Sequence, residues 1–140
     1  MTRVERGASR RQARRAAMVL LYQSQLTGRD MDELIGRYEA DTRTPLPGYA
    51  RSLIQDVTRT IVELDETIGA HAKGWTIDRI SPVEHSAMRI AIAELDGDEV
   101  PAAVAIAEAV ALVKRYASPE AATFVNGVLG AVARARGVGR

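Results

Sequence analysis

The strongest indication of the fold class is the stretch Pro101–Val113, which reads PAAVAIAEAVALV. Its residues are apolar on almost every side of a helical wheel, and a helix of that kind is normally buried inside a protein. The proline suits the start of such a helix, because its fixed backbone angle fits the first turn. The sequence therefore predicts a helix that begins at Pro101 and forms the centre of the fold.

Further helices are predicted on both sides of this stretch, because apolar residues recur there at the three-and-four spacing of one helix face. The predicted helices cover residues 8–26, 31–38, 49–74, 82–95 and 119–135, together with the helix that begins at Pro101. Residues 40–48 contain two prolines and are predicted to be a linker. No segment alternates polar and apolar residues as a β-strand does, so the predicted fold class is all-α.

Several of these helices carry recognisable signals at their ends. Gly28 can end the first helix, and Asp30 can cap the second. Ser81-Pro82 is a strong start, in which Glu84 can close a capping box with the serine. Ser118-Pro119 repeats the same start for the last helix.

Length and composition limit the classes of protein to which this chain can belong. The 140 residues suffice for one domain with a real core but not for two, so residues 1–140 are expected to form a single domain. No apolar run is long enough to span a membrane, and the N-terminus lacks the apolar segment of a signal peptide. Cysteine is absent, which excludes disulfides, thiolate zinc sites and cysteine nucleophiles. The expected location is the cytoplasm.

The net charge of +1 conceals a strong asymmetry along the chain. Residues 1–15 contain six arginines and one glutamate, whereas residues 30–120 contain nine basic and seventeen acidic residues. The C-terminal tail is basic again. An acidic body repels nucleic acid in general, while a focused basic patch can hold one strand locally.

No arrangement of residues in the sequence carries a recognisable enzyme chemistry. His71 and His85 are the only histidines, and neither has a partner at metal-ligand spacing. A glycine-rich phosphate loop and a nucleophile–base pair are also absent. Glu108, in its apolar stretch, is expected to be satisfied by a helix cap or an arginine rather than to act as an acid. We therefore expect a protein that is not an enzyme and has no cofactor or metal.

Two short segments at opposite ends of the chain could together contact RNA. On a helical wheel Arg11, Arg14 and Arg15 fall beside the apolar face, so the first helix can pack and still present guanidinium groups to phosphates. The second segment, Phe124–Leu129, has an aromatic ring and an amide that can meet a base. Each segment also has an ordinary interpretation. The arginines can simply be a solvated helix end, and Phe124 can be a core residue.

The last predicted helix contains two glycines one turn apart, Gly127 and Gly130. Each costs up to about 1 kcal/mol relative to alanine inside a helix. A helix accepts that cost where another backbone approaches closely, so we expect Gly127 to pack against the helix that begins at Pro101.

Two functions from different classes fit these features. The first is an RNA-binding and protein-adaptor module. The second is a structural or DNA-binding helical module, which needs a tight helix-turn-helix with a polar recognition helix. The predicted helices after residue 81 are too apolar for that role, so the first interpretation is favoured.

The sequence resembles the NusB family of bacterial transcription antitermination factors. The resemblance covers nearly the whole chain in the family's order, and its most distinctive element is FVNGVL at Phe124–Leu129. The other matching segments are Arg10–Arg14 (RRQAR), Leu21–Gln23 (LYQ), Val83–Glu84 (VE), Met88–Ala91 (MRIA), Glu94–Leu95 (EL), Val100–Pro101 (VP) and Ile106–Val110 (IAEAV).

The resemblance implies an all-helical fold of two packed three-helix subdomains. It also implies that the protein binds boxA-type single-stranded RNA together with NusE, a small-subunit ribosomal protein, and helps RNA polymerase to resist termination, notably on ribosomal RNA operons. A NusB-like module acting in ribosomal RNA maturation is the alternative. A similar domain occurs fused to ribosomal RNA cytosine methyltransferases, but a chain of 140 residues favours the stand-alone factor. Some relatives are dimers that bury the arginine surface, so monomer and homodimer both stay open.

Carried over position by position, the resemblance implies two surfaces. The RNA surface consists of Arg10, Arg11, Arg14, Arg15, Arg89, Phe124 and Asn126. The surface for the ribosomal protein includes Tyr22, Glu84 and Glu120. The sequence departs from the family pattern at Ala107, where asparagine is usual, and at Gly130, where an acidic residue is frequent. Thr123 replaces a frequent basic residue, which puts the strength of the RNA contact in doubt.

Overall fold

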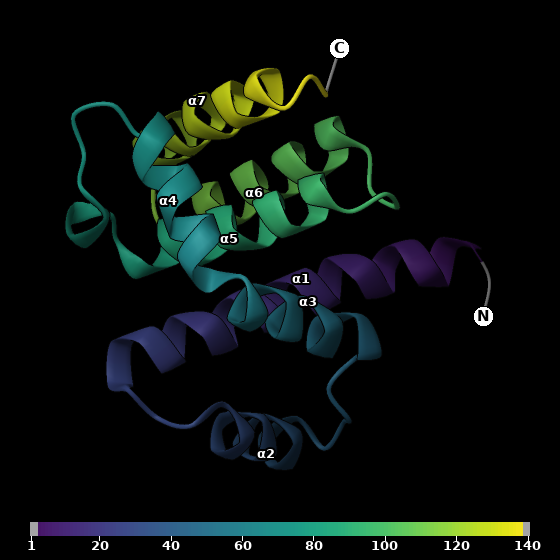
Figure 1. The fold of residues 1–140 in the computed structure, drawn as a ribbon. Coiled ribbons are helices and arrows are strands. Elements are labelled where there is room, and N and C mark those ends of the chain that lie inside the picture. The colour runs from purple at the N-terminus through teal and green to yellow at the C-terminus, as the bar shows by residue number, and fades with distance from the viewer. Residues whose placement is uncertain (1–2, 139–140) are drawn as a thin grey trace.

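A computed structural model describes residues 3–138, which form seven α-helices and one 3-10 turn but no strand (Figure 1). The elements are α1 (Arg3–Thr27), α2 (Met31–Thr42), α3 (Gly48–Arg59), α4 (Ile61–His71), η1 (Ile77–Arg79), α5 (Pro82–Asp96), α6 (Ala102–Tyr116) and α7 (Pro119–Ala135). The predicted all-α fold class is confirmed. In the described range, no helix is both long enough and apolar enough to cross a membrane.

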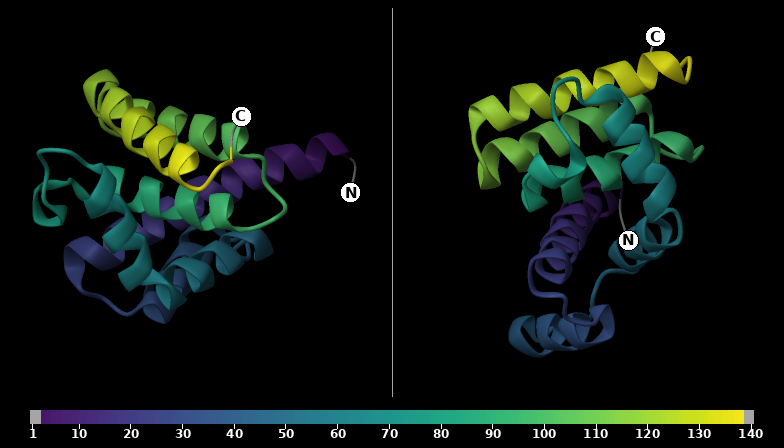
Figure 2. Two further views of the ribbon diagram at one scale, coloured as in Figure 1. Left: turned by 45° about the horizontal axis from the view of Figure 1, so that its top comes forward. Right: turned by 60° about the vertical axis from the view of Figure 1, so that its left-hand side comes forward.

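The helices are arranged in two groups that share α5 as their contact (Figures 1 and 2). In the first group α1 packs against α2 and α3, and in the second group α6 and α7 pack against each other and against α5. Helix α4 joins the second group through α5 and α7, while α5 also packs on α1 and α3. The second group therefore has four helices rather than the three that the resemblance implied.

The extra helix arises because the helix predicted over residues 49–74 is interrupted at Thr60. This residue has φ −116° and ψ 23°, and its hydroxyl donates to the carbonyl of Asp56 at 2.8 Å. A threonine hydroxyl bonded to the carbonyl four residues earlier tends to bend a helix. The buried face predicted for one long helix is broken at the same point, because Ile61 directly after the bend is 38% exposed.

The central helix of the fold is α5, not α6 as the sequence predicted. Ten of the fifteen residues of α5 are buried, whereas α6 buries only Ala105, Ala109 and Val113. The difference follows from position, because α5 packs on five other helices and α6 packs mainly on α5 and α7. One side of α6 therefore faces solvent in spite of its apolar sequence, and Val104 is 41% exposed.

The helix ends follow the predicted signals with one exception. Gly28 ends α1 with a positive φ of 70°, a conformation that favours glycine. The Asp30 side chain accepts hydrogen bonds from two N–H groups of α2, and Ser118 accepts one from α7. Ser81 has the extended backbone of a cap, but its side chain makes no capping hydrogen bond. The predicted capping box with Glu84 is therefore not formed.

Candidate nucleic-acid interface

The arginine cluster of α1 divides into three surface residues and one buried residue. Arg15 is exposed, Arg10 is partly exposed, and the Arg11 side chain is 76% exposed although it pairs with Glu108 at 3.1 Å. Of the two partners expected for Glu108, a helix cap or an arginine, the structure shows the arginine. Arg14 is only 5% exposed, so the prediction that it presents its guanidinium group at the surface is wrong.

Arg14 is held by a carboxylate from α5 and an aromatic ring from α3. Its Nε donates to both carboxylate oxygens of Glu94, at 3.1 and 3.0 Å. The Tyr49 hydroxyl donates to the same carboxylate. The tyrosine ring also lies below the guanidinium carbons of Arg10 and Arg14, 4.7 and 5.8 Å from its centroid. These contacts join three helices, so Arg14 is placed to hold the fold together.

The protonation of this cluster favours its hydrogen bonds. Burial, and then the hydrogen bond to Glu94, raises the pKa of Tyr49 to about 12. The phenol therefore stays protonated and remains a donor at physiological pH. Because the side chains of Arg14 and Glu94 are 5% and 2% exposed, each neutralises a charge that water cannot reach.

Arg89, also predicted for the RNA surface, lies in a second buried cluster. Its Nε and Nη2 donate to the two carboxylate oxygens of Asp65, at 2.9 and 2.8 Å, and the residue is 8% exposed. The ring of His85 lies between that carboxylate and an amide, with Nε2 2.6 Å from Asp65 Oδ1 and Nδ1 3.2 Å from Gln25 Nε2. The cluster joins α1, α4 and α5, and it keeps Arg89 away from the surface.

The shifts of pKa in this cluster agree with a neutral histidine beside a carboxylate. Burial lowers the pKa of His85, although the hydrogen bond with Asp65 acts in the opposite direction. Burial acts to raise the pKa of Asp65, but the hydrogen bonds from Arg89 and His85 outweigh it and lower that pKa. In this state Nε2 of the ring donates to Asp65, and Nδ1 accepts from the amide of Gln25.

The exposed arginines of α1 border a groove of about 490 Å³ between α1 and α6. Small and apolar side chains of α6 line it, and Arg115 from the last turn of that helix lies beside Arg11 and Arg15. Glu108 also lines the groove, where it pairs with Arg11. The three guanidinium groups outnumber this one carboxylate and suit the backbone of a polyanion, because arginine binds phosphate with a planar fork. Sequence reasoning missed Arg115, because a single basic residue at a helix end does not reveal which helix it faces.

The FVNGVL segment lies on α7, with its later aliphatic residues directed inward. Val125, Val128 and Leu129 are buried, whereas Asn126 and Gly127 are exposed. Phe124 is half-buried and packs against the core on one side. Phe124 is therefore both a core residue and a surface residue.

The expected packing of Gly127 against a second helix is not observed. A Cβ placed on this residue would have no heavy atom within 4 Å. At Gly130 the nearest atom is Nη1 of Arg134, 3.4 Å away, which is the flexible end of a side chain from the same helix. The two glycines therefore leave open surface on α7 rather than a contact.

A residue that the sequence analysis did not single out, Trp75, lies next to Phe124. Its ring centroid is 5.7 Å from that of Phe124, the two planes are inclined at 59°, and the tryptophan is 50% exposed. It belongs to the loop between α4 and α5. The sequence contains one signal for it, because a tryptophan that falls between two predicted helices is unusual enough to notice. What the sequence could not show is that this loop reaches α7.

The residues predicted for the ribosomal protein lie in two places. Tyr22 on α1 and Glu84 on α5 are both partly exposed, and each lies within one turn of a residue in the Gln25–His85 contact that joins these two helices. Glu120 is exposed in the first turn of α7, which packs on α4, α5 and α6. The structure thus brings Tyr22 and Glu84 into one region and places Glu120 on another helix.

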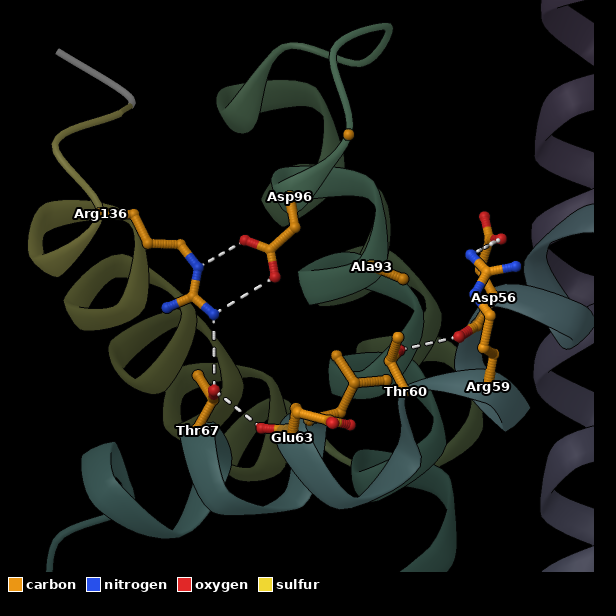
Figure 3. A pocket seen from close by; sticks show the side chains of 10 residues that line it. Asp56, Arg59, Thr60, Glu63, Thr67, Ala93, Asp96 and Arg136 are labelled. Carbon is orange, nitrogen blue, oxygen red and sulfur yellow. Dashed lines mark hydrogen bonds and ion pairs between the residues drawn. The ribbon is translucent and has the colours of Figure 1, made fainter.

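A second groove, of about 280 Å³, lies between the end of α3, α4, the last turn of α5 and Arg136, which directly follows α7 (Figure 3). Arg136 crosses it, donating to both carboxylate oxygens of Asp96 and, at 3.4 Å, to the hydroxyl of Thr67. None of the predicted site residues lines this groove. Its side chains bond one another, so their evident role is to tie the end of α7 to α4 and α5.

In the part of the chain that the structure describes, no three histidine, aspartate or glutamate side chains are placed to hold a metal ion. The candidate site is instead a surface with an arginine-bordered groove and a helix that exposes an aromatic ring and an amide. The fold and this surface together define a class of all-helical proteins with a charged binding surface.

Comparison with known proteins identifies the family within this class. The model of the NusB family matches residues 11–134. The transcription antitermination protein NusB of Salinispora tropica is 38% identical over 129 residues, which cover 89% of this chain and 95% of that protein. A solved structure of the antitermination factors NusB and NusE in complex with double-stranded RNA has a TM-score of 0.81 and 34% identity, covering 91% of this chain and 98% of that one. The chain belongs to the NusB family, and the resemblance is confirmed.

Proposed function

We propose that this protein is a transcription antitermination factor that binds boxA-type single-stranded RNA together with NusE, the small-subunit ribosomal protein. In that complex it helps RNA polymerase to resist termination, notably on ribosomal RNA operons. It acts in the cytoplasm as a single domain without enzyme activity. Membership of the NusB family supports this function, because relatives that are transcription antitermination proteins match over nearly their whole length.

The observation that carries the RNA part of the proposal is the groove between α1 and α6 with its three arginines. Five of the seven predicted residues stay in the proposed RNA surface, namely Arg10, Arg11, Arg15, Phe124 and Asn126. Arg14 and Arg89 leave it, because both guanidinium groups are buried against carboxylates. Moving either one to a phosphate would take the cationic partner from its carboxylate and leave only the hydrogen bond from Tyr49 or His85.

The test of this proposal is the salt dependence of RNA binding in the double variant Arg11→Ala, Arg15→Ala. Each lost phosphate contact removes roughly 0.7 from the log–log slope on single strands, so the slope should become shallower by about 1.4. The control is Arg37→Ala, an exposed arginine on α2 that takes part in none of the ion pairs among the described residues. An unchanged slope in the double variant would show that the arginines of α1 only solvate the helix.

The surface for the ribosomal protein is proposed where α1, α4 and α5 meet. Tyr22 and Glu84 border it, and the neighbouring turns of α1 and α4 expose Leu26 and Val62 by 60% and 64%. Exposed carboxylates on α4, including Glu66, add negative charge. Apolar side chains beside acidic ones suit a basic partner, because the apolar area supplies affinity and the charges speed the encounter.

A further inference from the structure

Two of the surface arginines of α1 pair with carboxylates of the same chain. Nε of Arg11 donates to Oε1 of Glu108 at 3.1 Å, and Nη2 of Arg10 lies 3.7 Å from Oε2 of Glu99. Glu108 belongs to α6, and Glu99 lies in the loop that leads into this helix. The function proposed above assigns both arginines to RNA and leaves the two carboxylates without a role.

The Arg11–Glu108 pair crosses the groove between α1 and α6. Both helices pack on α5, and among the described residues they have little direct contact with each other, so the pair spans the space between them. Glu108 lines this groove together with Arg11, Arg15 and Arg115. Its carboxylate therefore lies among the guanidinium groups that suit an RNA backbone.

The pair restricts how Arg11 can bind a phosphate. Arginine binds an oxyanion most strongly through two parallel N–H groups. The bond to Glu108 occupies Nε, so the fork formed by Nε and Nη2 is closed to a phosphate. A phosphate that uses the other end of the guanidinium group comes close to the carboxylate and is repelled by it. Tight binding of RNA at Arg11 therefore requires that Glu108 releases the arginine.

This release costs more than the loss of an ordinary surface ion pair. The Glu108 side chain is only 21% exposed, because it lies among small and apolar side chains of α6. A carboxylate with so little water around it depends on its cation. The Arg10–Glu99 pair is weaker, since its distance is longer and the Glu99 side chain is 79% exposed.

The other two arginines of the groove are placed differently. Among the described side chains, no carboxylate pairs with Arg15 or Arg115. Both can meet a strand at first contact, and Arg11 joins them once a phosphate has displaced its carboxylate.

We propose that Glu108 is an internal competitor of RNA for Arg11, and that it limits how tightly RNA of any sequence binds. Glu99 does the same for Arg10 to a smaller extent. This inference rests on the RNA-binding function proposed above. The competition acts on phosphate contacts, which are the same for every sequence. It keeps the affinity for unrelated RNA low, while a strand that also makes base contacts still binds.

The decisive variant is Glu108→Gln, which removes the charge but keeps the shape and an oxygen that can accept from Arg11. We expect it to bind a boxA-type strand and an unrelated oligouridine strand roughly 3- to 10-fold more tightly at low salt, because a unit charge about 4 Å away is worth about fivefold in water and more where water is scarce. Glu99→Gln should gain at most about twofold, because its pair is longer and more exposed. Fluorescence anisotropy of labelled strands measures these affinities.

The matched control is Glu33→Gln on α2. Glu33 is also a carboxylate paired with an arginine, at 3.5 Å from Arg29, so this change removes the same charge and one ion pair. Glu33 lies beyond the end of α1, which rises about 24 Å between Arg11 and Thr27. Charges are screened over about 10 Å at 0.1 M salt, so this variant should bind RNA as the wild type does.

A double-mutant cycle shows whether the competition acts through Arg11. In the Arg11→Ala background there is no pair to break, so the gain from Glu108→Gln should be smaller than in the wild type, by up to about fivefold. An equal gain in both backgrounds would mean that the carboxylate only repels RNA directly. That result would overturn the proposed competition.

The outcomes also separate this inference from the proposed function. If the wild type binds single-stranded RNA with the expected salt dependence but Glu108→Gln gains no affinity, the competition is wrong and the proposed function stands. A loss of affinity would show that the carboxylate shapes the groove for RNA, and a gain confined to the boxA-type strand would show that it acts on base contacts. Both results overturn the proposal. If the protein binds no single-stranded RNA with or without NusE, the proposed function itself fails.

Discussion

Arg11 and Arg14 lie one turn apart on α1, yet their guanidinium groups have opposite environments. Arg14 pairs with Glu94 where neither side chain reaches water, while Arg11 is largely exposed beside Glu108. Removing one partner of a buried pair leaves a buried charge, so Arg14→Ala should lower the free energy of unfolding by about 3–5 kcal/mol. Arg11→Ala should change it by at most about 1 kcal/mol. Urea unfolding of the two variants measures the difference, and equal effects would contradict the assignment of Arg14 to the core.

Gly127 offers a second test at the residue scale, on the stability of α7. Because a Cβ there meets nothing within 4 Å, Gly127→Ala should gain helix propensity without a clash and raise the free energy of unfolding by about 0.5–1 kcal/mol. Gly28→Ala is the contrasting variant, since Gly28 has a positive φ and alanine is strained there. Thermal melting should therefore shift up for Gly127→Ala and down for Gly28→Ala. A lower melting temperature for Gly127→Ala would restore the idea of close packing at this residue.

At the scale of helices, the cluster of His85, Asp65, Arg89 and Gln25 should make the joint between α1, α4 and α5 sensitive to pH. The pKa of His85 is lowered by burial from its ordinary value of 6.5, so the unfolded chain binds a proton more readily than the folded one. The free energy of unfolding should therefore fall as the pH drops below about 7, with a slope of at most about 1.4 kcal/mol per pH unit. A second loss should follow as the pH falls below about 4, because the pKa of Asp65 is lowered from 3.8.

Urea unfolding at several pH values between 8 and 5 measures the first of these losses. His85→Gln should flatten the slope in this range, because the glutamine cannot take up a proton. His71→Gln, which changes the other histidine, should keep it. A slope that persists unchanged in His85→Gln would assign the pH dependence to other groups.

The helices themselves were largely predictable, because their signals are local. Asp30 and Ser118 cap the helices that the sequence assigned to them, and the apolar spacing located each segment. The bend at Thr60 was not predictable, since a threonine with the same local sequence can also continue a helix. The central position of α5 was missed for another reason: His85, Arg89 and Glu94 made it look partly polar, and the partners that allow their burial come from distant helices.

Prediction of the candidate site was limited in the same way, by contacts between residues that are distant in the sequence. Sequence and family resemblance together found the surface arginines Arg10, Arg11 and Arg15, because their positions relative to the apolar face of α1 are local. They wrongly assigned Arg14 to the same surface, because the carboxylate that binds it lies 80 residues later in the chain and cannot be matched to it from the sequence. The contact of Trp75 with Phe124 was missed because only the folded chain brings the loop between α4 and α5 next to α7.

For the whole molecule, the asymmetry of charge separates two kinds of partner. Basic side chains border the groove between α1 and α6, while the body of the chain between residues 30 and 120 has seventeen acidic and nine basic residues. An acidic surface repels RNA and attracts a basic ribosomal protein, so one small protein can hold both on different faces. Bound to this protein, the ribosomal protein would also neutralise part of the acidic surface and make RNA binding easier.

This division of surfaces predicts the effect of Glu84→Lys. Reversing a charge on the proposed partner surface should slow association with NusE by about tenfold at low salt. RNA binding by the isolated protein should stay the same or improve.

The matched control is Asp32→Lys, because Glu84 and Asp32 are both acidic residues in the first turn of a helix. Each change loses the same favourable interaction with the helix dipole, about 0.3–1 kcal/mol, but only Glu84 lies on the proposed partner surface. Stopped-flow association rates and melting temperatures of both variants make the comparison. If Glu84→Lys associates with NusE as fast as Asp32→Lys, Glu84 serves only the start of α5 and the ribosomal protein binds elsewhere.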